Sequence, residues 1–119
     1  MKHEIVDLLW NDYPKIFSGK AYPECGDGWY DLIDSLCHTI QNNIDLHKTE
    51  QFVCTQIKEK FGGIRFYGGP ADGEIYDIID FAEAHSFKVC ERCGNRGELR
   101  GGSGWLYTSC AEHAREEVR

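Results

Sequence analysis

Three cysteines and one histidine near the end of the chain have the types and spacing of metal ligands. They are Cys90, Cys93, Cys110 and His113, which form a C-x2-C pair and a C-x2-H pair separated by sixteen residues. Two ligands separated by two residues can bind one ion from a tight turn, and Gly94 allows the chain to turn after Cys93. The sequence therefore predicts a closed tetrahedral Cys3His site that holds a structural Zn²⁺.

Two other interpretations of these four residues stay open. The cysteines could be reduced core residues that bind no metal. A catalytic zinc requires an open coordination position and a nearby general base, and Glu91 and Glu112 could serve as that base only if His113 is not a ligand. The His-x-Glu and Pro-Cys-x-x-Cys pairing of the zinc deaminases does not occur in this chain. We therefore expect a structural metal.

The composition of the chain limits its class. With 119 residues, of which 41% are hydrophobic and 13% aromatic, the chain is long enough for one domain with a core. No apolar run approaches the roughly 20 residues of a membrane helix. The first residues lack the apolar segment of a signal peptide. We therefore expect a cytoplasmic protein, and in that compartment clustered cysteines indicate a metal more often than disulfides.

The negative charge is concentrated in the first three quarters of the chain. The net charge is −7, yet residues 90–119 carry five basic and five acidic groups. A protein that coats nucleic acid by bulk electrostatics needs many uncompensated Lys and Arg side chains. The charge distribution therefore argues against that class, although it permits a local basic patch.

Three helices are predicted in the part of the chain that precedes the metal ligands, and they must help to position these ligands. A short amphipathic helix is predicted to end before Pro14. A second helix is expected over residues 28–43 with Asp27 as its N-cap, and a third over residues 73–86 with Asp72 as its N-cap.

Residues 52–67 are predicted to form a β-hairpin around a Gly62-Gly63 turn, because glycines supply the positive φ of a tight turn. A helix over residues 50–60, ended by Gly62, is the alternative. In the hairpin, the residues expected on the inner face are Ile57, Phe61, Ile64 and Phe66. Those expected on the outer face are Lys58, Lys60, Arg65 and Tyr67.

The order of these elements predicts an α+β fold, since helices and strands are segregated along the chain. We expect a helical domain with a central hairpin over residues 1–88, followed by a zinc-ribbon-like module over residues 89–119. Within this module, a small hairpin is predicted on either side of residues 101–104. The second pair of ligands is expected at the start of a terminal helix over residues 110–118.

Acidic side chains form stripes on the second and third predicted helices. The candidates for partner binding are Asp27, Asp31, Asp34, Asp77 and Asp80, with His38 and Glu83 beside them. Such stripes could bind a basic partner or imitate a phosphate backbone. Two solvated helix faces are the simpler interpretation.

Basic side chains carry an alternative hypothesis, in which the module is a zinc ribbon that binds nucleic acid. The candidates are Lys58, Lys60, Arg65, Arg92, Arg96 and Arg100. Cations beside aromatic rings suit a surface that follows phosphates and stacks bases. The simpler interpretations are a solvated sheet face and arginines that balance the cysteine thiolates.

A small hydrolytic or thiol enzyme is the third hypothesis. The candidate residues are Asp31, Asp34 and His38 for a hydrolytic metal site, and Cys25 for a nucleophilic thiol. Cys25 precedes a helix N-terminus, which stabilises a thiolate, but no histidine lies close to it in the sequence to act as a base. Cys37 and Cys54 fall in apolar patterns and are expected to be buried.

Three stretches of the chain resemble a family of small proteins of bacteria and their phages or prophages, for which no biochemical activity is established. The stretches are GWYDLIDSLC (28–37), QIKEKFGGIRFY (56–67), and CERCG followed by GWLYTSCAEH (90–113). The resemblance implies a phage-like setting and an intact metal motif, and it supplies no catalytic residues. We therefore expect a zinc-stabilised interaction protein, a phage or prophage accessory factor that binds and inhibits or redirects a host protein.

Overall fold

The computed structural model describes residues 1–102 and 104–115. Within these residues the fold is α+β, as predicted, with three α-helices and two small antiparallel sheets. The elements are α1 (His3–Asp12), the 3₁₀ helix η1 (Asp27–Trp29), α2 (Tyr30–His47), β1 (Val53–Lys60), β2 (Gly63–Gly69), α3 (Gly73–Ser86), β3 (Glu98–Arg100), β4 (Tyr107–Ser109) and the 3₁₀ helix η2 (Ala111–His113). None of the helices that the structure describes is long and apolar enough to cross a membrane.

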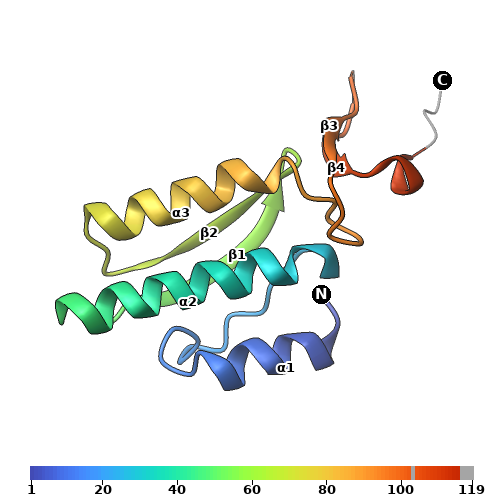
Figure 1. Ribbon diagram of the computed structural model, residues 1–119. Coiled ribbons are helices and arrows are strands. Elements are labelled where there is room, and N and C mark those ends of the chain that lie inside the picture. The colour runs from blue at the N-terminus through green and yellow to red at the C-terminus, as the bar shows by residue number, and fades with distance from the viewer. Residues whose placement is uncertain (103, 116–119) are drawn as a thin grey trace.

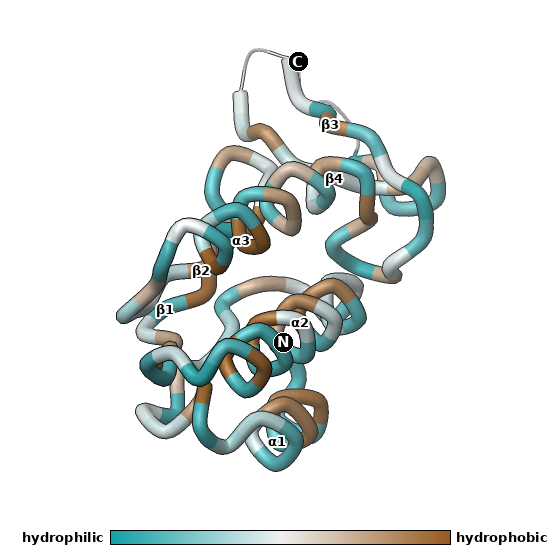
Figure 2. Tube along the Cα trace, turned by 60° about the vertical axis from the view of Figure 1, so that its left-hand side comes forward, coloured by the Kyte–Doolittle hydropathy of each residue, from teal (hydrophilic) through white to brown (hydrophobic). Residues whose placement is uncertain are grey.

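The helices pack against the β1–β2 hairpin through their apolar sides. α2 and α3 run in opposite directions side by side in front of the hairpin, and α1 lies below α2 (Figure 1). Hydrophobic and hydrophilic positions alternate along each helix (Figure 2). One continuous core results, and its fully buried members include Phe17, Trp29, Ile33, Phe52 and Ile57. Burial of these side chains is the main source of stability in this part of the molecule.

The predicted helix starts are confirmed for α3 and wrong for α2. The Asp72 carboxylate accepts a hydrogen bond from the backbone N–H of Ile75 at 3.0 Å, so Asp72 caps α3 as expected. α2 instead begins at Tyr30, after the 3₁₀ turn η1. The carboxylate of Asp27 accepts a hydrogen bond from the backbone N–H of Lys2 at 2.8 Å and does not cap α2. This contact with the distant N-terminus could not be anticipated from a local capping pattern.

Residues 53–69 form the predicted hairpin rather than the alternative helix, with Ile57 opposite Phe66 and Lys58 opposite Arg65. The turn lies one residue earlier than predicted, because the two residues between the strands are Phe61 (φ 54°) and Gly62 (φ 88°). Positive φ at both central residues is what a two-residue hairpin turn of type I′ requires.

The turn explains why Phe61 is not on the inner face of the hairpin. Its side chain is 65% exposed, whereas Ile57, Ile64 and Phe66 are buried as predicted. The backbone N–H of Gly62 donates to the Glu59 carboxylate at 2.8 Å, which closes the turn.

Both edges of the hairpin are occupied by other parts of the chain. On the β2 edge, the backbone N–H of Phe66 donates to the Glu83 carboxylate of α3 at 3.0 Å. On the β1 edge, the backbone N–H of Glu24 donates to the carbonyl of Ile57 at 2.9 Å. An isolated two-stranded hairpin is only marginally stable, so these contacts help to hold it in the fold.

The C-terminal segment contains the predicted small hairpin but not the predicted terminal helix. β3 pairs antiparallel with β4, with Leu99 opposite Thr108. Helical structure ends at His113, because Ala114 has φ −64° and ψ 131°, which are extended values. The predicted helix is therefore wrong at residues 114–115, and its remainder over residues 116–118 lies outside the described residues.

Candidate metal centre

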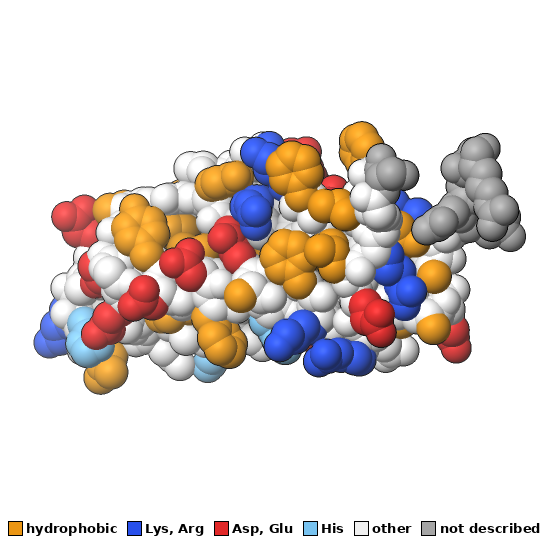
Figure 3. Space-filling view, turned by 90° about the horizontal axis from the view of Figure 1, so that it is seen from above, with side chains coloured by type: hydrophobic (Ala, Val, Ile, Leu, Met, Phe, Trp, Pro, Cys, Tyr) orange, Lys and Arg blue, Asp and Glu red, His pale blue; other side chains and the backbone are white. Residues whose placement is uncertain are grey.

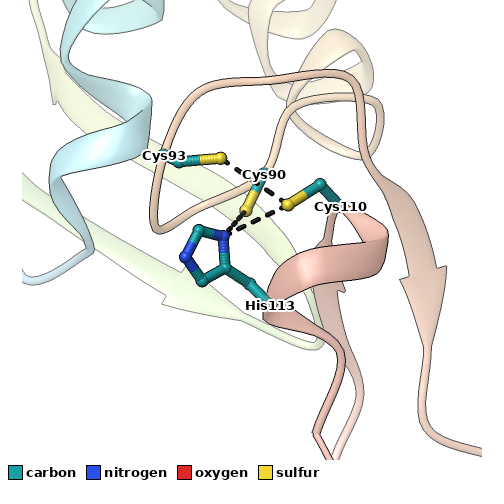
Figure 4. Close-up of side chains that lie close together, drawn as sticks. All are labelled: Cys90, Cys93, Cys110 and His113. Carbon is teal, nitrogen blue, oxygen red and sulfur yellow. Dashed lines mark hydrogen bonds between the residues drawn. The ribbon is translucent and has the colours of Figure 1, made fainter.

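The four predicted ligands converge at one point near the C-terminus (Figure 4). They are Cys90, Cys93, Cys110 and His113, and one ligand atom from each lies within 4.8 Å of all the others. The Sγ atoms of Cys93 and Cys110 are 3.6 Å apart, and His113 Nδ1 lies 3.6 Å from Cys90 Sγ and 3.1 Å from Cys110 Sγ. Sulfurs at about 2.3 Å from a tetrahedral ion would be separated by about 3.8 Å. The cluster could therefore hold a metal ion with only small adjustments.

A tight turn presents the first pair of ligands. The backbone N–H of Gly94 donates to the carbonyl of Cys90 at 2.9 Å, and the N–H of Cys90 donates to the carbonyl of Asn95 at 2.8 Å. Gly94 has φ 82°, a conformation that glycine adopts without strain. We call residues 90–95 the knuckle. This closed loop directs the Sγ atoms of Cys90 and Cys93 toward the same point, where one metal ion could bind.

The second pair of ligands is presented by a single 3₁₀ turn. Cys110 precedes η2 and His113 ends it, and the backbone N–H of His113 donates to the carbonyl of Cys110 at 3.2 Å. Residues three apart in a 3₁₀ turn lie on the same side. Nδ1 of the His113 ring therefore faces the sulfurs although the following described residues, 114–115, are not helical.

The knuckle lies directly against the chain segment that leads into α2. The backbone N–H of Gly28 donates to the carbonyl of Glu91 at 2.8 Å, and the N–H of Gly26 donates to the Glu91 carboxylate at 2.9 Å. A Cβ at Gly28 would lie 2.2 Å from the carbonyl oxygen of Cys90. Only glycine at position 28 therefore allows the two backbones to lie this close. The indole N–H of Trp29 donates a further hydrogen bond to the carbonyl of Val89 at 2.9 Å. Sequence reasoning missed this contact, for which the G-x-G pattern at residues 26–28 was the only signal.

The tip of the β1–β2 hairpin lies against the other side of the C-terminal segment. The hydroxyl of Thr108 donates to the carbonyl of Gly62 at 2.6 Å, and Thr108 is buried. A Cβ at Gly62 would lie 2.5 Å from Leu99 Cδ1, and one at Gly63 would lie 2.4 Å from the Phe87 ring. Gly62 therefore allows the hairpin tip to fit against β3 and β4, and Gly63 allows it to fit against Phe87 at the end of α3.

The protein environment favours negative charge on the first ligand. Burial alone would raise the pKa of the Cys90 thiol, but hydrogen bonds from the backbone N–H groups of Cys110, Cys93 and Arg92 lower it to about 6. At Cys93, the hydrogen bond from the backbone N–H of Asn95 lowers the pKa, and the neighbouring sulfurs outweigh it, so the pKa is raised. Three sulfurs this close cannot all be anionic without a compensating cation. The site therefore has the electrostatic character of a cation-binding centre.

The remaining three cysteines have the opposite environment. Cys25, Cys37 and Cys54 are buried, as predicted for the last two. Burial raises the pKa of the Cys25 thiol to about 12, with a further contribution from Glu91, and burial also raises the pKa of Cys54 to about 12. The predicted stabilisation of a Cys25 thiolate is therefore wrong, because the cost of burial exceeds any effect of the following helix.

Two of the five acidic candidates line the same groove. Asp31 of α2 and Asp77 of α3 line a common groove, and Asp80 is exposed on α3. Asp34 accepts a hydrogen bond from the Tyr13 hydroxyl at 2.6 Å. Asp34 thus holds the loop after α1 in place, and Asp27 is bonded to Lys2 as described above.

The groove itself was not predicted. It has a volume of about 700 Å³ and lies between α2 and α3, ending at the knuckle. Its apolar lining includes Leu32, Leu36, Ile78, Phe81 and Ala82. Single-helix patterns cannot reveal it, because its two walls come from helices that are separated by 25 residues in the sequence.

The basic candidates divide between the hairpin and the C-terminal segment. On the hairpin, Lys58 and Arg65 face each other across the strands. The Lys60 ammonium lies 5.7 Å from the centroid of the Phe61 ring. In the C-terminal segment, Arg92 and Arg96 are exposed.

Arg100 is half-buried, and its Nε donates to the carbonyl of Ser109 at 3.2 Å. This arginine therefore has a structural contact within the β3–β4 pair.

Comparisons with protein-family models, with curated proteins and with solved structures found no match to this chain. The resemblance to small bacterial and phage proteins therefore stays a prediction.

Proposed function

We propose that this chain is a zinc-stabilised interaction protein, in which a structural Zn²⁺ fastens the C-terminal segment and an exposed groove binds a partner protein. Three thiolates and one imidazole are a ligand set that zinc prefers. The cluster offers four ligand atoms, which is the number that a closed tetrahedral site requires. Such a site leaves no coordination position for a substrate, which supports a structural role over a catalytic one.

The apolar groove between α2 and α3 is the observation that carries the binding role. Its volume of about 700 Å³ falls within the range of pockets that bury ligands. Phe81, which lines the groove, is 76% exposed. Exposed apolar surface that is bordered by polar side chains marks interaction sites.

The proposed setting is the cytoplasm, and the proposed partner is a host protein bound by a phage or prophage accessory factor. The six cysteines form no disulfide, which suits a reducing compartment. The partner class follows from the resemblance of the sequence motifs, since accessory phage proteins commonly act by binding host macromolecules.

Affinity purification of the tagged chain from a bacterial lysate, with zinc analysis of the same sample, tests this function. We expect about one zinc per chain and a stoichiometric protein partner. A chain with one zinc and no captured protein would contradict the interaction role. A metal-free chain that melts like the purified protein would contradict the structural zinc.

A second candidate function, single-stranded nucleic-acid binding, is favoured by one observation. Phe61 and Trp105, exposed by 65% and 79%, line one small pocket together with Lys60. Exposed aromatic rings beside a cation can stack bases and contact phosphates. Binding to labelled oligonucleotides should weaken steeply with salt, and further in Lys60→Ala and Arg96→Ala variants. Failure to bind DNA or RNA at low salt would exclude this candidate.

A further inference from the structure

The groove between α2 and α3 has two walls with matching residue spacing. The α2 wall contains Asp31, Leu32, Ser35, Leu36 and Thr39, and the α3 wall contains Asp77, Ile78, Phe81, Ala82 and His85. Each set follows the pattern i, i+1, i+4, i+5, i+8, which is one stripe of a helix. Eight residue steps correspond to about 12 Å along each axis. The groove therefore has two ridges that lie side by side, and each ridge is slightly more than two helical turns long.

The two helices that form the groove carry only negative formal charge. α2 contains three carboxylates and α3 contains four, and neither contains Lys or Arg. Four of these carboxylates are engaged within the protein. Asp34 accepts a hydrogen bond from Tyr13, and Glu83 accepts one from the backbone of Phe66. Asp45 accepts one from Gln41, and Glu74 accepts one from Asn43. Asp31 and Asp77 are exposed at the groove, and acidic and hydrophobic side chains are intermixed over α3 (Figure 3). An occupant of this groove would thus meet apolar surface flanked by uncompensated negative charge.

The apolar part of the groove is not covered by the described chain. Leu32, Ile78 and Val89 are only partly buried although they adjoin the core. The ring of Phe81 is stacked on that of His85, with centroids 6.4 Å apart and an interplanar angle of 8°. This pair forms a flat, exposed aromatic wall on the α3 side.

We propose that the groove binds a basic amphipathic helix of the partner protein. This inference rests on the proposed function, because it names the chemistry of the partner. A third helix laid along two neighbouring helices can place apolar anchors at i, i+4 and i+7, which span about 10 Å and match the groove. Lys and Arg side chains beside these anchors would face Asp31 and Asp77, which supplies specificity and a faster encounter.

The test uses labelled peptides and the zinc-loaded full chain. One peptide of about 18 residues, or five helical turns, has Leu on one face and Lys on the other. A second peptide replaces every Lys by Glu, and a third scrambles the first sequence. We expect the Leu/Lys peptide to bind at low salt, the other two to bind at least about tenfold more weakly, and the affinity to fall with salt. Amide shifts in ¹⁵N spectra should map to Ser35, Phe81 and their neighbours.

Two pairs of variants separate the groove from general electrostatics. Asp31→Lys with Asp77→Lys should weaken binding of the Leu/Lys peptide by at least about tenfold. Glu4→Lys with Glu50→Lys makes the same change in net charge at exposed positions outside the groove, and it should change the affinity by less than about threefold. Ser35→Trp would fill the groove without a change in charge and should abolish binding. Ser18→Trp, at an exposed loop position, should not.

Other outcomes would overturn the proposal. Equal binding of the basic and acidic peptides would indicate a site for any apolar ligand. A dimer of the chain that Ser35→Trp dissociates would indicate a second copy as the occupant. Equal weakening by both charge-reversal pairs would indicate net charge alone. If Ser35→Trp still captures the same protein from a lysate as the unaltered chain, the groove is excluded as the binding site, and only the role of a zinc-stabilised interaction protein stands, with the partner bound elsewhere.

Discussion

The first 88 residues and the C-terminal segment of this molecule are held together by different forces. All 18 buried core residues in the part of the chain that the structure describes belong to the first region. The C-terminal segment, residues 89–115, has few buried groups of its own, namely Cys90, Gly97, Thr108, Ser109 and Cys110. Burial of apolar area therefore stabilises the first region. A segment as small as the second requires another source of stability, such as a structural metal ion. Two of its buried groups are members of the metal cluster.

The six cysteines show the same difference on a smaller scale. Cys25, Cys37 and Cys54 are buried in the core with raised thiol pKa values. Cys90 is also buried, yet backbone N–H groups point at its sulfur and lower its pKa. Burial alone therefore does not decide the chemistry of a cysteine. The orientation of nearby backbone donors, which the knuckle imposes, decides it.

The largest expected effect comes from removal of a metal ligand. Cys93→Ser should reduce zinc from about one per chain to nearly none, because apparent binding free energies of structural zinc reach about 10–16 kcal/mol in small fingers. Amide hydrogen exchange should then become fast in residues 89–115 while α2 stays protected. As the matched control, Cys37→Ala should keep the zinc and lower the stability of the core by about 1–3 kcal/mol. Protection of the C-terminal segment without zinc would contradict the division between the two regions.

The next largest effect is expected where the two regions touch backbone to backbone. Gly28→Ala should lower the free energy of unfolding by about 3 kcal/mol, since the new Cβ would lie 2.2 Å from the carbonyl oxygen of Cys90. Gly73→Ala is the control. Gly73 is the first residue of α3, and a Cβ added there would have no other atom within 4 Å. Gly73→Ala should therefore raise the free energy of unfolding by up to about 1 kcal/mol. Urea unfolding measures both, and equal effects would show that the knuckle does not depend on this close approach.

A smaller effect is expected at the hairpin tip. Thr108→Val removes the buried hydrogen bond to the carbonyl of Gly62 and should cost about 1–3 kcal/mol. Thr39→Val removes an exposed bond to the carbonyl of Ser35 and should change stability by no more than about 0.5 kcal/mol. Thermal unfolding of both variants checks the difference. A neutral Thr108→Val would mean that the hairpin tip contributes little to holding the C-terminal segment.

The smallest effect concerns pH and the core cysteines. The pKa of Cys54 is raised by burial from an ordinary value of 9.0 to about 12. The unfolded chain therefore loses this proton near pH 9 while the folded chain keeps it, so stability is constant below about pH 9 and falls as pH rises toward 12. From pH 8 to pH 10 this thiol should cost about 1 kcal/mol of stability. Cys54→Val should remove that part of the loss, and parallel pH curves for both proteins would contradict it.

Much of the local structure could be predicted from the sequence. Asp72 signals the start of α3, and the alternation around Ile57 and Phe66 signals a hairpin, because capping and side-chain periodicity are local properties. The errors occur where a distant contact intervenes. Asp27 has the pattern of an N-cap but is bonded to Lys2, and Phe61 has the pattern of an inner residue but lies in the turn.

The sequence by itself determined the four candidate metal ligands, since C-x2-C and C-x2-H spacings bring such side chains together within single turns. Only the tertiary structure decided what these turns rest on and what else the chain presents. The knuckle meets Gly28 across more than 60 residues of sequence, and Asp31 and Asp77 line one groove. Both arrangements depend on how closely separate segments approach one another. Close approach is set by packing of the whole core, which no local pattern encodes.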